Sequence, residues 1–283
     1  MLTLVTGTGY TGRRVLDRLP ADAVIGLSRS VIDTTQPQQA FDLDTAESLP
    51  VTLPASYSVI YTVPPKGPAP DERLQRFLRL LQPPPKRFVY ISTTGVYGDC
   101  GGDVVTEATA VNPSNDRAAR RVAAEEQLSR WAADNHCELV VLRAPGIYGP
   151  GRLGIERVEA GMPVLSESDA NPGNRIHVDD LASCCIAALS SDVVGIFNVG
   201  DGDHRSSTWF TGEVARQLGL PLPPEISRDE ANVAFSAQRL SFMSDSRRVD
   251  TTRMRQVLNV LPRYGNPEEG IRASLAQESE RRW

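Results

Sequence analysis

The stretch Val5-Thr6-Gly7-Thr8-Gly9-Tyr10-Thr11-Gly12 decides the fold of this chain. A short aliphatic run precedes it, and a polar stretch with helical spacing follows it. In a G-x-G-x-x-G turn between a strand and a helix, Gly7 permits the tight turn, Gly9 lets the backbone approach a pyrophosphate, and Gly12 lets the helix pack closely on the strand. The N–H groups at the start of the helix favour phosphate. The stretch therefore predicts a dinucleotide-binding turn.

Strands and helices alternate through the first half of the chain. The runs that predict strands are 2–6, 23–27, 39–43, 58–63, 87–92 and 138–143, and those that predict helices are 10–19, 71–81 and about 116–136. Nearly continuous apolar runs, such as Phe88-Val89-Tyr90-Ile91, are typical of parallel strands that are buried on both faces. This alternation predicts an α/β fold with a doubly wound parallel sheet of the Rossmann type.

The pattern loosens after Pro145, where glycine and proline cluster. A strand-to-helix unit at 175–190, a strand at 195–199 and a helix at 207–218 follow, and then a largely helical tail. We expect a dinucleotide-binding domain formed by 1–145 and 175–200. Residues 146–174 and 201–283 then form a smaller, mostly helical substrate lobe.

Composition excludes several functional classes. The 30 basic and 35 acidic residues give a net charge of −5, which does not suit a nucleic-acid-binding protein. The longest nearly apolar run, 181–189, is far shorter than the ~20 residues of a membrane span. Neither a secretory signal nor a membrane partner is expected. Four cysteines without C-x-x-C spacing and three histidines predict no metal site, and free thiols suggest a reducing cytoplasm.

The end of the second strand bears on the choice of cofactor. An acid at this place binds the ribose 2′-hydroxyl of NAD, and an arginine accommodates the 2′-phosphate of NADP. Here the segment ends in Ser28-Arg29-Ser30, without an acid. The three side chains can together donate hydrogen bonds to a phosphate, and Arg13 and Arg14 follow the glycine turn. We therefore expect NADP, with NAD as the alternative.

Further motifs carry a resemblance to a known family. They are Phe41-Asp42-Leu43, Tyr61-Thr62-Val63-Pro64-Pro65, Tyr90-Ile91-Ser92-Thr93-Thr94-Gly95-Val96-Tyr97-Gly98, the run from Arg143 to Arg152, the run from Arg175 to Ala182 and Phe197-Asn198-Val199-Gly200. Together with the glycine turn, they resemble the extended short-chain dehydrogenases/reductases, which include nucleotide-sugar epimerases and dehydratases. The resemblance places Thr93 at the catalytic Ser/Thr position. It implies cofactor contacts by Tyr10, Thr11, Asp42, Leu43, Val63, Pro64, Ser92, Pro145 and Gly146.

One departure from the family concerns its catalytic tyrosine and lysine, which lie four residues apart on one helix face. At these places the chain has Arg117 and Arg121, and none of its seven tyrosines is followed by lysine four residues later. Arginine stays protonated at any working pH, so neither residue can be the usual proton donor. The chain resembles the atypical branch of the superfamily, which lacks the standard active site.

Two functions of different class remain open. The first is an NADP-dependent oxidoreductase or an epimerase/dehydratase-like enzyme with a non-standard acid or base. Its small substrate, anionic or sugar-like, would bind to Arg117 and Arg121 through paired hydrogen bonds, with Thr93 and Tyr148 as further catalytic candidates. Glu125, one turn onward, is the other anion that could lie between the arginines. The second function is a catalytically inactive NADP(H) sensor. A homodimer is an option that the resemblance leaves open.

Overall fold

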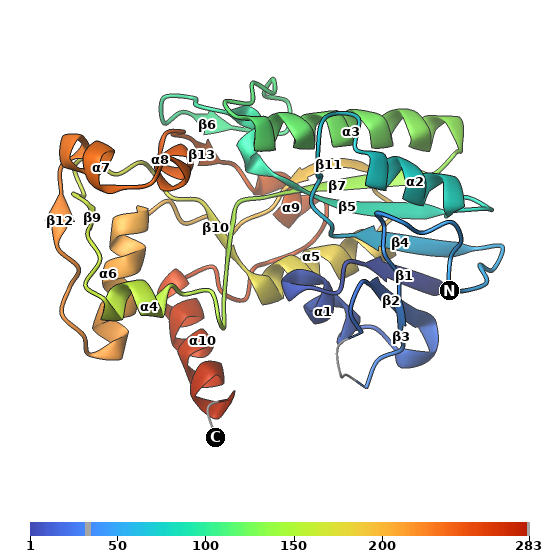
Figure 1. Ribbon diagram of the computed structural model, residues 1–283, viewed down its shortest axis with the longest axis horizontal. Coiled ribbons are helices and arrows are strands. Elements are labelled where there is room, and N and C mark those ends of the chain that lie inside the picture. The colour runs from blue at the N-terminus through green and yellow to red at the C-terminus, as the bar shows by residue number, and fades with distance from the viewer. Residues whose placement is uncertain (32–34, 282–283) are drawn as a thin grey trace.

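A parallel sheet of seven strands forms the centre of the computed structural model, which describes residues 1–31 and 35–281 (Figure 1). The strands are β1 (Leu2–Thr6), β2 (Val24–Ser28), β3 (Gln38–Ala40), β4 (Tyr57–Tyr61), β5 (Arg87–Thr93), β7 (Glu138–Ala144) and β11 (Gly195–Asn198). Their order in the sheet is β11-β7-β5-β4-β1-β2-β3, and every neighbouring pair is parallel. The order reverses between β1 and β4, and such a switch point is where open α/β sheets bind ligands. The predicted α/β class is confirmed.

Helices cover both faces of the sheet. In Figure 1, α2 (Glu72–Leu80) and α3 (Asp116–Asp134) lie above it, and α1 (Tyr10–Leu16) and α5 (Val178–Ser190) lie below it. Successive residues of a strand point to opposite faces, so Leu4 joins one buried apolar cluster and Val5 joins the other. Burial on both faces explains the continuous apolar runs of the strands.

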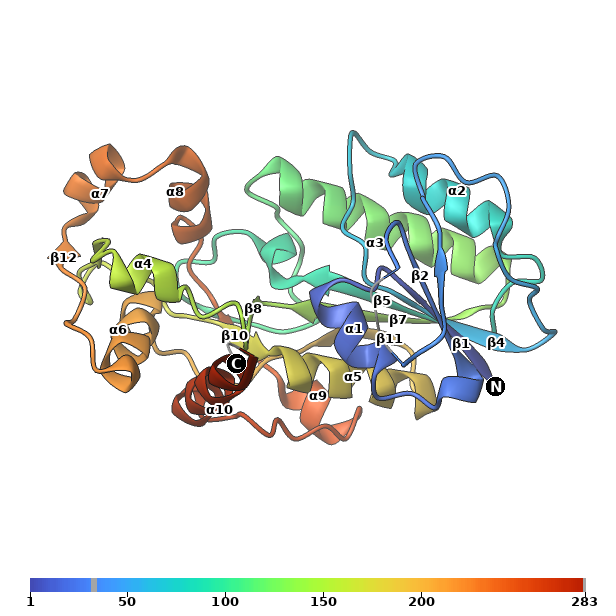
Figure 2. The same cartoon turned by 60° about the horizontal axis from the view of Figure 1, so that its bottom comes forward.

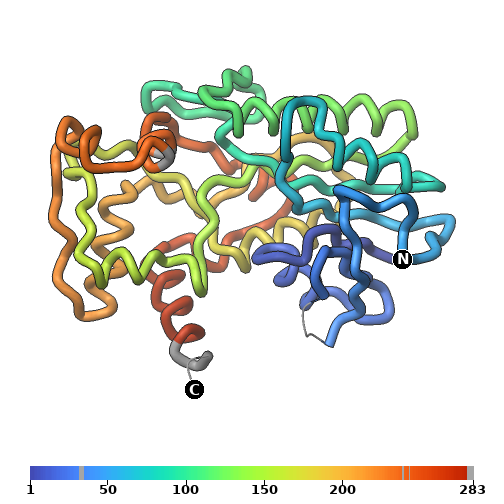
Figure 3. Tube along the Cα trace, in the orientation of Figure 1, coloured from blue at the N-terminus to red at the C-terminus, as the bar shows by residue number. Residues whose placement is uncertain are grey.

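A smaller lobe lies beside the sheet (Figure 2). Its helices are α4 (Ile155–Glu159), α6 (Ser207–Leu218), α7 (Arg228–Ala234), α8 (Ala237–Met243) and α10 (Pro267–Arg281). The short strand pairs are β8 (Gly146–Tyr148) with β10 (Arg175–His177), β9 (Val164–Leu165) with β12 (Glu225–Ile226), and β6 (Val104–Val105) with β13 (Arg248–Val249). The remaining elements are α9 (Thr252–Gln256) and the 3₁₀ turns η1 (Ala21–Ala23) and η2 (Thr94–Tyr97). The trace in Figure 3 passes between sheet and lobe several times, so the lobe is built from separate segments of the chain.

Two predicted elements end three residues earlier than the sequence suggested. The helix predicted for 10–19 ends at Leu16, with Asp17 as its C-cap. The strand predicted for 39–43 spans only Gln38–Ala40, because Asp42 turns the chain by accepting a hydrogen bond from the Asp44 N–H at 2.9 Å. Within the described residues, no helix is long and apolar enough to cross a membrane.

Candidate active site

The glycine turn between β1 and α1 has three glycines with three different surroundings. Gly7 has a φ of +92°, in the region that favours glycine. A Cβ at Gly12 would lie 1.9 Å from the carbonyl oxygen of Gly7, so only glycine lets the helix lie this close. A Cβ at Gly9 would have no atom within 4 Å. The Thr62 hydroxyl, at the end of β4, donates to the Gly7 carbonyl at 2.6 Å and fixes the turn.

A cavity of about 620 Å³ opens at this turn, at the switch point of the sheet. The residues predicted to bind cofactor that line it are Gly7, Gly9, Tyr10, Thr11, Ser28, Arg29, Ser30, Asp42, Leu43, Val63, Pro64, Ser92 and Pro145. Gly12 is absent from the lining because it packs against the turn itself. Gly146 was expected to contact cofactor, but it lines the neighbouring cavity instead. We call this space the cofactor cavity.

One end of the cofactor cavity is formed by the ends of β2 and β3. There the Ser28 hydroxyl donates to the Ser30 carbonyl at 2.7 Å and accepts from Thr8, so its proton is already engaged. Arg29 is exposed at the cavity wall. Its charge contributes to a lowered pKa of Asp44, although the hydrogen bond from Lys66 is the main cause. Arg29 is therefore a cation available at this end, whereas Arg73, which also lines the cavity, lies 3.7 Å from Asp44.

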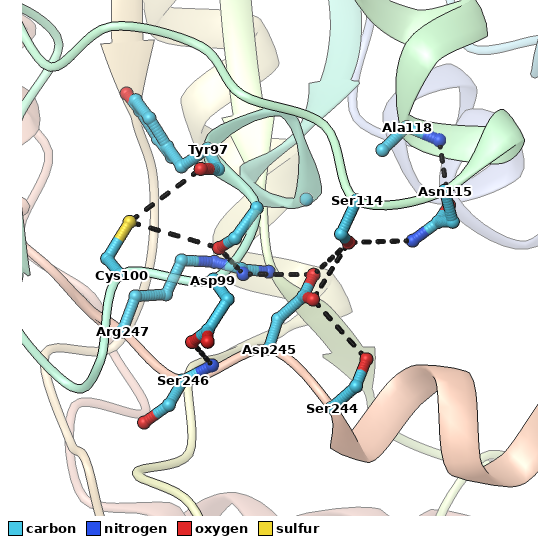
Figure 4. Close-up of polar contacts among 12 residues, drawn as sticks. Tyr97, Asp99, Cys100, Ser114, Asn115, Ala118, Ser244, Asp245, Ser246 and Arg247 are labelled. Carbon is cyan, nitrogen blue, oxygen red and sulfur yellow. Dashed lines mark hydrogen bonds and ion pairs between the residues drawn. The ribbon is translucent and has the colours of Figure 1, made fainter.

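A second cavity of about 870 Å³ adjoins the first. It is lined by six arginines, namely Arg117, Arg152, Arg157, Arg175, Arg239 and Arg247. Asp245 is its single acidic lining residue in the described part of the chain, and that carboxylate accepts from the Ser114 hydroxyl at 2.8 and 2.9 Å and lies 3.3 Å from Arg247 (Figure 4). The cavity therefore has an excess of positive charge. We call it the arginine-lined cavity.

Arg117 and Arg121, four residues apart on α3, were expected to face one pocket together. The structure places them in different cavities. Arg117 lines the arginine-lined cavity, and Arg121 lines the cofactor cavity. Arg121 donates to the Ile91 carbonyl at 2.8 Å and to the Tyr90 hydroxyl at 3.0 Å, and these bonds hold its guanidinium against β5. Arg117 is the member of the pair that can reach a substrate in the second cavity.

Glu125 does not lie between these two arginines, so that expectation was wrong. It is buried, accepts a hydrogen bond from Ser92, and forms an ion pair with Arg143 at 2.7 Å. The guanidinium of Arg143 also lies 4.9 Å from the centre of the Tyr97 ring. A buried ion pair needs such additional partners to offset its desolvation. This network connects α3 and β7 to the end of β5.

Thr93 lies at the end of β5 and lines both cavities. Its Oγ1 accepts a hydrogen bond from the Gly95 N–H at 3.2 Å, which leaves its own proton to be donated. Pro145, Ile147 and Arg152 are shared by the two linings as well. The predicted catalytic Thr93 thus lies where the cavities meet.

Tyr148 also lines the arginine-lined cavity, but its hydroxyl is directed elsewhere. Its ring packs edge-on against His177 and Phe210, each with a centroid separation of 5.2 Å. A Cβ at Gly270 of α10 would lie 2.1 Å from the Tyr148 hydroxyl. Burial raises the pKa of Tyr148. The ring forms part of the wall, and the predicted catalytic role of Tyr148 receives no support from this arrangement.

Sequence reasoning missed several lining residues. Thr62 and Arg73 belong to the cofactor cavity, and Arg157 and Arg239 belong to the arginine-lined cavity. Arg157 lies on α4 and Arg239 on α8, so no local spacing joins them. Thr62 stood next to the predicted Val63 at a strand end, and that position was an available signal.

Comparisons with known proteins agree with this architecture. Residues 73–200 match the model of the NAD-dependent epimerase/dehydratase family. Protein YeeZ of Escherichia coli (strain K12) is 32% identical over 192 residues, which are 64% of each chain. The first curated relatives align over only 31% to 64% of their own lengths.

Solved structures match over nearly the whole chain. A functionally unknown conserved protein from Silicibacter pomeroyi is 28% identical with a TM-score of 0.80, and the match covers 98% of this chain and 99% of that one. MoeE5, solved in complex with UDP-glucose and NAD, is 21% identical with a TM-score of 0.77 over 100% and 99% of the two chains. These comparisons relate the chain to the NAD-dependent epimerase/dehydratase family, as the resemblance to an atypical short-chain dehydrogenase/reductase implies, and its sequence contains no Tyr-x-x-x-Lys pair.

Proposed function

We propose that the protein is an NADP-dependent oxidoreductase, or an epimerase/dehydratase-like enzyme, that acts on an anionic substrate. One observation carries this proposal. The cofactor cavity continues into a second cavity of about 870 Å³, and Thr93, Pro145, Ile147 and Arg152 belong to both walls. A volume of this size suits a small-molecule ligand. A protein that only binds a dinucleotide has no need of a second cavity beside it.

The cofactor cavity fits a dinucleotide. The open space above Gly9 lets a pyrophosphate approach the backbone, and Arg29 and Ser30 lie at the opposite end for a 2′-phosphate. Asp42, Leu43, Val63 and Pro64 complete the adenosine side of the wall, as the family resemblance implies. The cofactor, when bound, supplies hydride transfer. This chain's residues bind it, orient it and exclude water.

Arginine side chains in the second cavity support an anionic substrate. Arg157 and Arg239 both line it, and neither forms an ion pair with any described residue. Burial lowers the pKa of Arg239, and the like charge of Arg157 lowers it further. Two neighbouring cations repel each other unless an anion lies between them. A substrate phosphate or carboxylate would relieve that repulsion.

Thr93 and Arg117 are the residues that we assign to the reacting end. The Thr93 hydroxyl can donate a hydrogen bond to a substrate oxygen, because its oxygen already accepts from Gly95. Arg117 remains charged at any working pH and stabilises negative charge that develops on the substrate. Since arginine cannot donate its proton, the proton moves through Thr93 or through substrate-bound water.

An activity screen tests the proposal. Purified protein is mixed with NADPH or NADP⁺ and matched pairs of anionic and neutral carbonyl compounds or alcohols. Nicotinamide absorbance reports net oxidation or reduction, and mass spectrometry or NMR of the compounds reports epimerisation or dehydration, which leave the cofactor in its starting state. We expect turnover of an anionic compound and little turnover of its neutral partner. Turnover of neutral partners alone would contradict the substrate class.

The alternative function is a catalytically inactive NADP(H) sensor. The missing Tyr-x-x-x-Lys pair favours it, as does the Tyr148 hydroxyl that lies beside Gly270 rather than free in the cavity. A sensor would bind NADPH tightly, leave the absorbance unchanged and convert none of the compounds. A survey of ligands that copurify with the protein, by mass spectrometry, separates the two functions, because a sensor would carry only the dinucleotide.

A further inference from the structure

Arg152 lies where the two cavities meet, next to the glycine turn. It belongs to the loop of residues 149–154 between β8 and α4, and it lines both cavities. Its guanidinium carbon lies 3.9 Å from the centre of the Tyr10 ring. Tyr10 follows Gly9 directly, so the charge of Arg152 reaches the glycine turn from the side of the second cavity.

The arginines next to the glycine turn in sequence are engaged elsewhere. Arg14 forms an ion pair with Asp179 at 3.1 Å and does not line the cofactor cavity. Arg13 lies 4.0 Å from Asp17 and does not line the cofactor cavity. The expectation that Arg13 and Arg14 add charge near the phosphates therefore receives no support from the structure. Arg152 forms no ion pair with a described residue, and an exposed stacking contact is what holds its guanidinium.

The backbone of this loop is fixed on both sides. The Gly151 N–H donates to the carboxylate of Glu278 on α10. At Gly149, which has a φ of +144°, a Cβ would lie 2.7 Å from the Tyr10 hydroxyl and 2.8 Å from Val178. The loop is thus pressed against the glycine turn, and only glycine fits at the contact. These contacts hold the backbone next to Arg152 close to the cofactor cavity.

We propose that Arg152 binds the nicotinamide-side phosphate of the dinucleotide. This inference rests on the proposed cofactor site and adds a specific residue to it. Arg29 and Ser30 mark the adenosine end of the cofactor cavity, and Arg152 lies at the end shared with the arginine-lined cavity. The backbone of the turn supplies N–H donors but no charge. The guanidinium leaves the Tyr10 ring for a charge-assisted hydrogen bond to the phosphate, the stronger of the two contacts.

Three commercially accessible probes separate the phosphates. All three probes have the 2′-phosphate. Of the two phosphates of the pyrophosphate, adenosine 2′,5′-bisphosphate has only the adenosine-side one, and 2′-phospho-ADP-ribose has both but lacks nicotinamide. NADPH is the complete cofactor. For Arg152→Ala, we expect the Kd of NADPH and of 2′-phospho-ADP-ribose to rise by about 10- to 100-fold, as the loss of a charge-assisted contact implies. The Kd of adenosine 2′,5′-bisphosphate stays unchanged. Isothermal titration calorimetry measures the three Kd values. If wild-type protein binds NADH more tightly than NADPH, the corresponding probes without the 2′-phosphate are AMP, ADP-ribose and NADH.

Arg13→Ala is the matched control, because it removes an exposed arginine beside the same turn. It leaves all three affinities unchanged. Three results would overturn the proposal: no change in any Kd for Arg152→Ala, an equal rise in all three, or a rise for NADPH alone, which would assign Arg152 to the nicotinamide. Wild-type protein that binds none of the probes would overturn the proposed function itself, and this inference with it. Normal NADPH binding by Arg152→Ala leaves the proposed function standing.

Discussion

The glycine turn and the arginine-lined cavity present their binding groups in different ways. At the turn, the groups proposed to bind the cofactor phosphates belong to the backbone, and one short stretch of sequence from Gly7 to Gly12 determines their conformation. In the arginine-lined cavity, the groups proposed to bind substrate are side chains. They come from α3, α4 and α8 and from other segments as far along the chain as Arg247. A site made by the backbone is visible in local sequence, because the need for glycine is local. A site made by distant side chains becomes visible only in three dimensions.

The two regions also differ in charge. The turn is neutral, and its backbone is satisfied by contacts such as that from Thr62. In the wall of the arginine-lined cavity, Arg175 is paired with Asp203 and Arg247 with Asp245, but the like charge of Arg157 lowers the pKa of Arg239. Under the proposed function, a bound anion would offset this repulsion. We therefore propose that the turn fixes the geometry of the bound cofactor and that the arginine-lined cavity selects the charge of the substrate. The predictions below test this division.

The largest effect is expected at Gly9. Its Cβ would meet no protein atom, so Gly9→Ala keeps the fold while its methyl group occupies the space of the pyrophosphate. NADPH binding should be abolished in a fluorescence titration, with an unchanged Tm without ligand. Gly12→Ala is the opposite case, because its Cβ would lie 1.9 Å from the Gly7 carbonyl oxygen. It should lower the Tm strongly. Normal NADPH binding by Gly9→Ala would place the cofactor elsewhere.

Arg117 and Arg121 lie on the same helix, α3, but line different cavities, so substitutions of these two residues test whether the cavities have different roles. Arg117→Ala should lower kcat/KM by ~10², about 3 kcal/mol of transition-state binding, and leave NADPH affinity unchanged. Arg121→Ala removes hydrogen bonds to Ile91 and Tyr90 and should cost about 1–3 kcal/mol of stability, seen in urea unfolding. Measurements of substrate kinetics and of urea unfolding on both variants distinguish the proposed roles of Arg117 and Arg121. Equal losses of kcat/KM in both variants would contradict their assignment to different cavities.

Arg29 tests the charge selection within the cofactor cavity. Replacement by alanine should remove about 1.5–3 kcal/mol of binding to the 2′-phosphate. The Kd of NADPH should then rise by about one to two decades, and the Kd of NADH should hardly change. Calorimetric titration of both cofactors measures the difference. Tighter binding of NADH by wild type would show that the protein prefers NAD.

Much of the nucleotide-binding half could be predicted from the sequence. β1 begins and ends at the predicted residues. In the smaller lobe, α6 does too, because Ser206 caps its start and Gly219 ends it in a left-handed conformation. Most residues of the cofactor wall were predicted as well, since they lie at strand ends along one edge of the sheet. Local sequence carries both kinds of information.

The arginine-lined cavity could not be predicted in the same way. Spacing on α3 put Arg117 and Arg121 on one helix face, but the end of β5 separates the spaces that they reach. Glu125 was expected near them, and its burial with Arg143 depends on a strand that comes later in the chain. The NADP preference, a homodimer, a cytoplasmic location and the division into domain and lobe stay predictions.

The smallest effect is expected at Asp201, which follows β11 between the sheet and the lobe. It is 3% exposed, and burial raises its pKa to about 7, although the Asp203 N–H donates to it at 2.9 Å. The folded protein therefore keeps a proton that the unfolded chain loses near pH 4. Wild type should lose stability as the pH rises from about 4 to about 7, since ionised Asp201 is costly in the fold.

Asp201→Asn removes this ionisation while keeping an oxygen that can accept from Asp203. The free energy of unfolding of the variant relative to wild type should increase by about 2 kcal/mol between pH 5 and pH 8. Urea unfolding at both pH values measures it, and the difference between the two proteins cancels the titration of other groups such as His177, whose pKa burial lowers to about 4. A difference that does not vary with pH would mean that Asp201 is ionised in the folded protein. In that case the nearby buried Arg175 offsets its desolvation, and the charge of the lobe is more nearly balanced at this junction than the cavity lining suggests.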